Sequence, residues 1–237
     1  MKNLKYLEDI KLVIFDLDGT LVDAYEAITK SVNFTLKKIG YKEAPASRIR
    51  QAVGWGDRRL LGAFIEDKYF NLSSIEGKVY PSGLDSALVI YRRHHRRALE
   101  KYSKLLPGAK ELLEYLKPRD FKTAIASNRP TEFTRIILRC LSLRKYFDYV
   151  LCADKLPEGK PNPEILFRIM QRLKVKPGQV VYVGDMTIDV ETARNAGVLS
   201  IAVGGGSSSL AEIKKAKPFK IIKSLAFLMK LLPPISA

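Results

Sequence analysis

The sequence predicts an α/β fold: a parallel sheet with helices on both faces and, inserted into it, an all-helical domain. Three observations support this prediction. Short apolar runs rich in β-branched residues recur along the chain, amphipathic stretches of about a dozen residues separate most of them, and the first interval is about a hundred residues long. Alternating strands and helices form βαβ units, whose right-handed crossovers place helices on both faces of a sheet. The predicted core is therefore Rossmann-like.

Each predicted strand is a short apolar run bounded by polar or turn residues. The strand candidates are 11–16, 121–126, 148–151, 180–184, 199–203 and, more weakly, 219–222. Amphipathic helices are predicted at 108–117, 131–140, 162–174, 187–195 and 208–215. Because helices join consecutive strands, the sheet is predicted to be parallel, with the carboxyl ends of its strands at one edge.

The long interval after the first strand predicts a separate helical unit, because a structureless connection of that length is improbable. Apolar positions repeat at helical spacing up to Gly40, and further helices are predicted at 57–70 and 83–103. A Pro-Gly pair at 107–108 marks the return to the core. The predicted domains are a core at 1–20 and 105–237 and a helical unit at 21–104.

Composition limits the class of protein. The chain has 237 residues, of which 46% are hydrophobic and 28% charged, a balance that argues against disorder. No apolar stretch is long enough to span a bilayer, so no membrane partner is predicted. The formal net charge of +16 would attract phosphorylated metabolites, nucleic acid or an anionic membrane surface, but charge alone does not specify a site.

The cysteines and the first residues bear on the compartment. Cys140 and Cys152 form neither a C-x-x-C pair nor a disulfide framework, and both follow apolar stretches. We therefore expect buried free thiols and a reducing, cytoplasmic location. The first ten residues mix charges with no long apolar run, so no signal peptide is predicted.

The most informative residues are two carboxylates at the end of the first strand. Asp16 and Asp18 follow four apolar residues, and Gly19 opens a turn. Ligands bind at the carboxyl ends of strands in open α/β sheets, and alternate strand positions project to the same side. The sequence therefore predicts that both acids serve a ligand site. The alternative is a strand-end turn with two solvated aspartates.

Polar residues also follow two later strands. Ser127 and Asn128 follow the second predicted strand. Asp185 follows another predicted strand, and Asp189 comes four residues later. Lys160 lies in a loop restricted by two prolines. Each has an ordinary alternative: a helix cap for the serine, a helix N-terminal charge for Asp189, and an exposed charge for the lysine. Together they can support phosphoryl transfer, in which a carboxylate attacks phosphorus while Mg²⁺ and a lysine neutralise the repulsion between anions.

In this order the motifs resemble those of the haloacid dehalogenase superfamily of phosphohydrolases. Four segments carry the resemblance: 16–20, Ser127, Lys160 and 184–189. The resemblance covers essentially the whole chain, and the helical insert stands where this superfamily has its type-1 cap. Flanking segments, among them 160–164, are most similar to those of phosphoglycolate phosphatases, although related small phosphatases share them.

The resemblance implies a role for each matched residue. Asp16 would be the nucleophile that forms an aspartyl-phosphate, and Asp18 the general acid and then the general base. Asp16, Asp185 and the main-chain carbonyl of Asp18 would hold Mg²⁺, with Asp189 supporting them. The residues implied to bind the transferred phosphoryl group are Ser127, Asn128 and Lys160. An acid at the position of Asp18 favours phosphoester hydrolysis over dehalogenation, because it can protonate a leaving alkoxide.

The cap is expected to select the substrate. Trp55 lies between two glycines and offers a rigid apolar surface, while Arg48 or Arg58 could clamp a substrate carboxylate. A turn between helices is the alternative for this glycine-flanked segment. His95 falls on an apolar helical stripe and is predicted to be packed rather than catalytic. The Gly-rich stretch at 204–206 lacks the spacing of a dinucleotide site and is predicted to be a loop.

These observations predict a Mg²⁺-dependent phosphatase that acts on a small phosphorylated metabolite, with 2-phosphoglycolate the leading candidate. A nucleotide or pyrophosphate phosphatase with the same site is the first alternative. The second, from another class, is a basic nucleic-acid-binding protein without turnover, to which the charge of +16 points. Nothing in the sequence predicts the oligomeric state.

Overall fold

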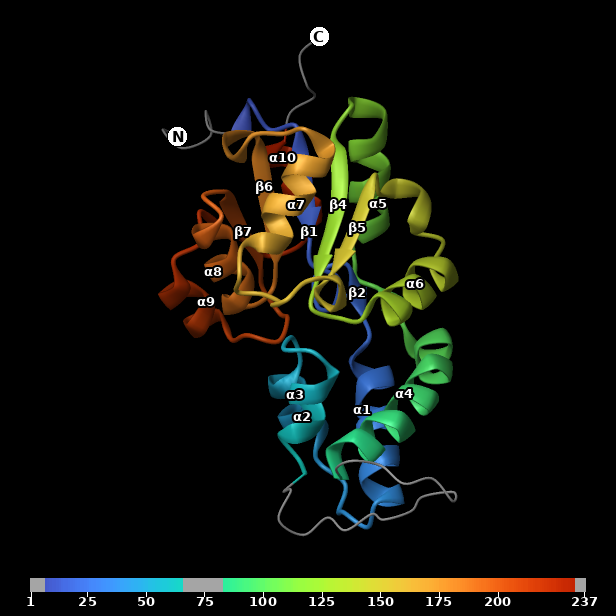
Figure 1. The fold of residues 1–237 in the computed structure, drawn as a ribbon. Coiled ribbons are helices and arrows are strands. Elements are labelled where there is room, and N and C mark those ends of the chain that lie inside the picture. Colours follow the sequence, from blue (N-terminus) through green and yellow to red (C-terminus); the bar gives the residue numbers. More distant parts are fainter. Residues whose placement is uncertain (1–6, 66–82, 233–237) are drawn as a thin grey trace.

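The computed structural model describes residues 7–65 and 83–232. Six strands form one sheet in the order β5-β4-β1-β6-β7-β8, and every neighbouring pair is parallel (Figure 1). The strands are β1 (Leu12–Phe15), β4 (Lys122–Ser127), β5 (Tyr149–Cys152), β6 (Val180–Gly184), β7 (Leu199–Val203) and β8 (Lys220–Ile222). The predicted Rossmann-like sheet is confirmed, and the weaker candidate at its end is a strand.

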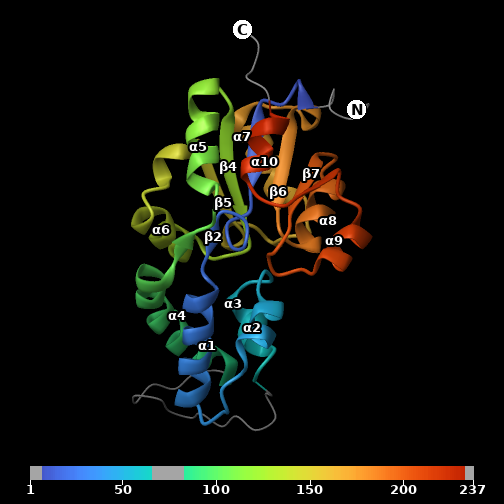
Figure 2. The same ribbon diagram turned by 180° about the vertical axis from the view of Figure 1, so that it is seen from behind.

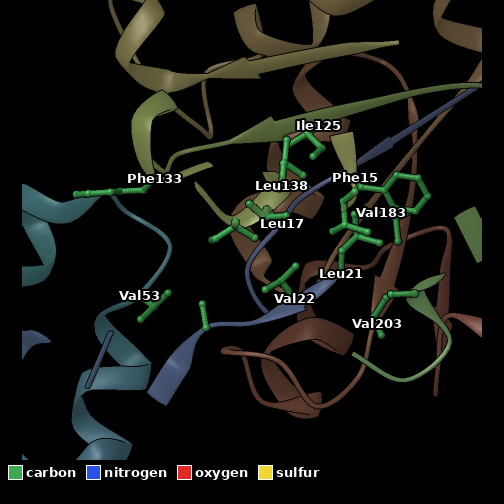
Figure 3. Close-up of a cluster of buried hydrophobic side chains, with 14 of the residues drawn as sticks. Phe15, Leu17, Leu21, Val22, Val53, Ile125, Phe133, Leu138, Val183 and Val203 are labelled. Atoms are coloured by element: carbon green, nitrogen blue, oxygen red, sulfur yellow. The ribbon is translucent and has the colours of Figure 1, made fainter. Parts of the chain in front are cut away.

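Helices cover both faces of the sheet, as alternation along β1 requires (Figures 1 and 2). Val13 and Phe15 face α5 (Ala109–Leu116), α6 (Thr131–Cys140) and α10 (Ala226–Leu231). Leu12 and Ile14 face α7 (Glu164–Leu173) and α8 (Thr187–Asn195), and α9 (Leu210–Ala216) packs beside β7. Figure 3 shows side chains of the first face, where Phe15, Ile125 and Val183 come from three adjacent strands.

Four helices lie beyond the carboxyl edge of the sheet (Figure 1). They are α1 (Tyr25–Lys38), α2 (Ala46–Ala52), α3 (Asp57–Gly62) and α4 (Gly83–Tyr102). Charges stabilise the ends of α1, because Glu26 lies in its first turn and lysines lie in its last turn, where they complement the helix dipole. Two short strands, β2 (Val22–Asp23) and β3 (Lys104–Leu105), pair antiparallel where the chain leaves and re-enters the sheet region.

The helical region differs from the sequence prediction in two ways. The helix predicted at 57–70 ends at Gly62, and its last residues, 66–70, lie outside the described residues. The sequence reasoning missed α2, a seven-residue helix that buries only Ile49 and so carries almost no apolar stripe. Short 3₁₀ segments connect elements of the core at Lys117–Arg119, Arg144–Tyr146, Ala153–Lys155 and Pro177–Gln179.

The prediction of two buried thiols is half wrong. Cys152 is buried at the end of β5, whereas Cys140 is exposed at the last position of α6. The apolar neighbours of Cys140 in sequence point to the core, but its own position on the helix faces solvent. Within the described ranges, no helix has the length and apolarity needed to cross a membrane.

Candidate active site

Five of the sequence-predicted residues meet in one pocket between the sheet edge and the cap helices. The parallel order β4-β1-β6 places the ends of these three strands side by side. The predicted residues that line the pocket are Asp16, Asp18, Ser127, Asn128 and Lys160. Helices α1, α3 and α4 supply Ile28, Leu60 and Tyr91 to the same pocket, so it lies between the two parts of the chain.

Lys160 is the buried cation at the base of this pocket. Its Nζ lies 2.9 Å from Asp16 Oδ1 and 2.6 Å from Asp189 Oδ1, and donates to the Tyr182 hydroxyl at 3.0 Å. Burial opposes the charged form, but the two carboxylates outweigh it and raise the pKa of Lys160 well above its ordinary value. The lysine is therefore a fixed positive charge, not a proton donor at neutral pH.

Asp185 is fully buried and lies close to Asp16. Thr20 Oγ1 donates to Asp185 Oδ1 at 3.0 Å, and the Ser207 main-chain N–H donates to Oδ2 at 2.7 Å. The Gly-rich segment is a loop, as predicted, but it also packs on this carboxylate: a Cβ at Gly206 would overlap the Asp185 side chain. Glycine is required at this position because the main chain comes so close to the Asp185 side chain.

Asp16, Asp185 and Asp189 form a cluster in which one oxygen of each lies within 4.8 Å of the others. Burial, opposed by Lys160 and reinforced by Asp189, raises the pKa of Asp16 to about 7. Burial, together with Asp189 and Asp16, raises the pKa of Asp185 to about 8. The positive charge of Lys160 is thus not enough to stabilise both carboxyl groups in their ionised form.

The charge balance of the site fits a hard divalent cation. Besides Asp57, which Arg92 binds, four carboxyl groups of the described residues meet here, on Asp16, Asp18, Asp185 and Asp189. The cations that face these four are Lys160 and Arg129. With all four groups ionised, two negative charges would be left over in a buried place, which is costly without a counter-ion and agrees with the raised pKa values of Asp16 and Asp185. Carboxylate oxygens are the ligands that Mg²⁺ prefers, so the residues present suit that ion.

Asp189 differs from the other two members of the cluster, because the protein already occupies both of its oxygens. Oδ1 accepts from Lys160 and from the Tyr182 hydroxyl at 2.9 Å, and Oδ2 accepts from the Met186 N–H at 3.0 Å. A Cβ at Gly184 would overlap this side chain, so the glycine lets α8 begin directly against the strand. The arrangement suits a residue that orients its neighbours.

The side chain of Asn128 is also fully engaged. Its Oδ1 accepts from the Lys160 N–H at 2.7 Å, and its Nδ2 donates to the carbonyls of Lys160 at 3.2 Å and of Gly54 at 3.0 Å. Asn128 therefore positions the lysine loop and contacts the segment before α3. Ser127 Oγ accepts from the Arg129 N–H at 3.1 Å, and Ser127 lines the pocket.

Comparisons with known proteins decide the family. The model of the haloacid dehalogenase-like hydrolases matches residues 13–203. The chain belongs to this hydrolase family. It is 30% identical to a phosphoglycolate phosphatase of Vibrio parahaemolyticus over 94% of this chain and 96% of the relative. A phosphoglycolate phosphatase of Aquifex aeolicus is 28% identical over 90% of this chain and 96% of the relative.

Solved structures of the family have the same fold. A predicted phosphoglycolate phosphatase from Haemophilus somnus superposes with a TM-score of 0.86 at 26% identity, covering 95% of this chain and 99% of that one. A putative phosphatase from Clostridium difficile gives a TM-score of 0.78 at 27% identity, covering 94% and 99%. The resemblance stated from the motifs is thus confirmed over almost the whole chain.

The three cap residues named from the sequence do not line the pocket that holds Asp16. Arg48 lies over the Phe64 ring on another part of the cap, and Arg58 pairs with Asp85 at 2.5 Å on the surface. Trp55 is 39% exposed and lines a neighbouring depression with Asn128 and Lys160. The glycines on either side of Trp55, Gly54 and Gly56, do line the pocket that holds Asp16.

The sequence reasoning missed Arg129, the second cation of the site. Its guanidinium binds both oxygens of Asp18, with Nε at 2.6 Å from Oδ2 and Nη2 at 2.8 Å from Oδ1. His95 is buried and stacked on Tyr91, as predicted, but its Nε2 also lies 2.9 Å from Arg129 Nη1. The available signal was position: Arg129 follows directly after the Ser-Asn pair of the family motif.

Proposed function

We propose that this protein is a Mg²⁺-dependent phosphatase that hydrolyses a small phosphomonoester through an aspartyl-phosphate on Asp16. The leading substrate is 2-phosphoglycolate. One observation carries the proposal: a strand-end aspartate lies in a pocket, 2.9 Å from a buried lysine and grouped with two further buried carboxylates. The relatives named phosphoglycolate phosphatase support the choice of substrate.

In this proposal the chain's own residues hold the metal ion. Asp16, Asp185 and the main-chain carbonyl of Asp18 would bind Mg²⁺, while Asp189 orients the cluster through Lys160 and the Met186 N–H. The ion, when bound, supplies the positive charge that lets an anionic phosphate approach an anionic nucleophile. The leftover negative charge of the site is the physical reason for this assignment.

The covalent steps use two aspartates. Asp16 attacks phosphorus, the bond from phosphorus to the ester oxygen breaks, and Asp18 gives its proton to that leaving oxygen. Water then attacks the aspartyl-phosphate, Asp18 takes a proton from the water, and the bond between Asp16 and phosphorus breaks. Lys160 and Ser127 hold phosphoryl oxygens throughout, so positioning and charge stabilisation provide most of the rate.

The proposed domains keep the boundaries expected from the sequence, a core at 1–20 and 105–237 and a cap at 21–104. The pairing of Val22 with Leu105 and of Asp23 with Lys104 supports a division at these crossings, because the insert leaves and returns there. Cap residues line the pocket opposite the carboxylates, which supports a role for the cap in substrate selection.

The test is phosphate release from a panel of compounds with and without Mg²⁺. The panel contains 2-phosphoglycolate, a nucleoside monophosphate, pyrophosphate and p-nitrophenyl phosphate. We expect release that requires Mg²⁺, is abolished by EDTA and is fastest with 2-phosphoglycolate. Preference for a nucleotide or pyrophosphate would select the first alternative. Salt-sensitive binding of nucleic acid without any hydrolysis would contradict the proposal.

A further inference from the structure

Asp18 is locked in the described structure by a two-point ion pair. Arg129 Nε and Nη2 lie 2.6 and 2.8 Å from its two oxygens, and both side chains are nearly buried. A guanidinium fork fixes the plane and the direction of the carboxylate that it binds. The lock holds a side chain that the proposed reaction needs at the leaving oxygen.

The guanidinium is itself held from the cap side. Arginine has no acceptor, so at 2.9 Å His95 Nε2 must accept from Arg129 Nη1 and the imidazole must be neutral. Its Nδ1–H then donates to Ser31 Oγ at 3.0 Å, and Ser31 donates to the Ala27 carbonyl at 2.8 Å. This chain anchors Arg129 Nη1 to α1 and α4 independently of Asp18.

The pocket offers few positive charges to a ligand. Among the described residues that line it, only Lys160 and Arg129 are cations. Lys160 uses its ammonium group on Asp16, Asp189 and Tyr182 at the phosphate end. Apart from the strand-end residues and from Asp57, which Arg92 binds at 2.8 Å, the other lining side chains are apolar or aromatic. They are Ile28, Val53, Leu60 and Tyr91 from the cap and Pro130, Phe133 and Met186 from the core.

We propose that Arg129 exchanges partners during the reaction, binding a carboxylate of the substrate and thereby releasing Asp18, which takes up a proton from water and carries it to the leaving oxygen. The inference rests on the proposed function and narrows its substrates to small phosphomonoesters that carry a carboxylate near the phosphate-bearing carbon. One carboxylate replaces another at the fork, so the guanidinium is never left buried without a counter-ion. His95 keeps the guanidinium in place while its partner changes.

The test compares two substrates that differ in one group, 2-phosphoglycolate and ethyl phosphate, by kcat/KM for phosphate release. We expect the wild-type protein to prefer 2-phosphoglycolate about 100-fold, the size of a good charge-assisted hydrogen-bond pair. Arg129→Met should reduce this preference to within about threefold, and Arg129→Lys, which keeps the charge but not the fork, should leave an intermediate preference.

Controls separate the possible outcomes. Arg139→Met removes an exposed arginine paired with Glu100 at 3.0 Å and should keep the wild-type preference. Circular dichroism shows whether Arg129→Met folds. If that variant does not fold, the substrate preference of Arg129→Lys provides the test. A preference unchanged in the Arg129 variants, or no preference in the wild type, overturns the inference while leaving a phosphatase. Absence of Mg²⁺-dependent release from every compound, p-nitrophenyl phosphate included, overturns the proposed function itself.

Discussion

The two ends of the pocket each hold a carboxylate, but by different means. At the sheet end, Asp16 is bound by Lys160, and both belong to the sheet-bearing part of the chain. At the cap end, Asp18 is bound by Arg129, which in turn contacts His95 on α4. A strand end places Asp16, and Asn128 holds the loop that carries Lys160. Asp18 and Arg129 also belong to the core, but only this second pair contacts the cap, through His95. In the proposed function, the first pair serves the chemistry and the second pair serves the choice of substrate.

The largest expected effect is at the sheet end. Asp16→Asn removes the proposed nucleophile and should lower kcat for 2-phosphoglycolate roughly 10⁴-fold or more, as loss of a covalent catalyst does. The measurement is steady-state phosphate release with saturating Mg²⁺. Asp9→Asn, at an exposed position, is the matched control and should behave as wild type. Turnover of Asp16→Asn at the wild-type rate would refute the proposed nucleophile.

Lys160 should matter for stability as well as for turnover. Lys160→Met keeps the length of the side chain but leaves Asp16 and Asp189 without their buried partner, so the free energy of unfolding should fall by about 3 kcal/mol. Urea denaturation measures it. The control Lys155→Met breaks an exposed pair with Asp154 at 3.8 Å and should cost less than about 0.5 kcal/mol. Equal stability of both variants would contradict the role of Lys160 as the buried counter-ion of Asp16 and Asp189.

A steric change tests the metal assignment without altering a ligand. Gly206→Ala places a Cβ against the Asp185 carboxylate and should raise the Mg²⁺ concentration needed for half-maximal activity about 10- to 100-fold. In Gly204→Ala the new Cβ would lie 3.7 Å from the Ile222 carbonyl oxygen, an ordinary contact, so its Mg²⁺ dependence should match the wild type. If the Gly206 variant also matches, Asp185 is not at the metal.

The smallest expected effect is a pH dependence at the cap end. Burial, and then the charge of Arg129, hold the pKa of His95 well below 6.5; His94 adds to this, and Tyr91 and Phe133 enclose the ring. Below pH 6.5 the unfolded chain therefore binds a proton that the folded protein does not. Stability should fall by up to about 1.4 kcal/mol per pH unit as the pH drops through this window.

The measurement is the free energy of unfolding at pH 7.5 and 5.5 for the wild type and for His95→Gln. The difference between the two proteins isolates His95 from the titrating carboxylates. We expect the wild type to lose more stability on acidification than the variant. An equal loss in both would mean that the imidazole is protonated in the folded state, which would contradict its hydrogen bond from Arg129.

The sheet end could be predicted from the sequence because a local signal, the end of an apolar run, marks each of its residues. Asp16, Ser127 and Asp185 each follow an apolar run directly, so the rule that ligands meet at strand ends places them together. The bond from Arg129 to Asp18 joins residues 111 positions apart through a side-chain direction that no periodicity encodes. Arg48 and Arg58 were chosen by residue type alone; Arg48 lies over the Phe64 ring, Arg58 pairs with Asp85, and neither lines the pocket.

The short ribbon of β2 and β3 has a consequence for the architecture. Val22 opposes Leu105 and Asp23 opposes Lys104, so the two chain segments that join the cap to the core are hydrogen-bonded neighbours. Because the entry and exit points adjoin, the intervening helices connect two neighbouring points of the six-stranded sheet region, as a surface turn would. Lengthening or exchanging those helices adds little loop-closure entropy for the sheet to overcome. The same sheet can thus carry lids of different size, which is a structural route to new substrates.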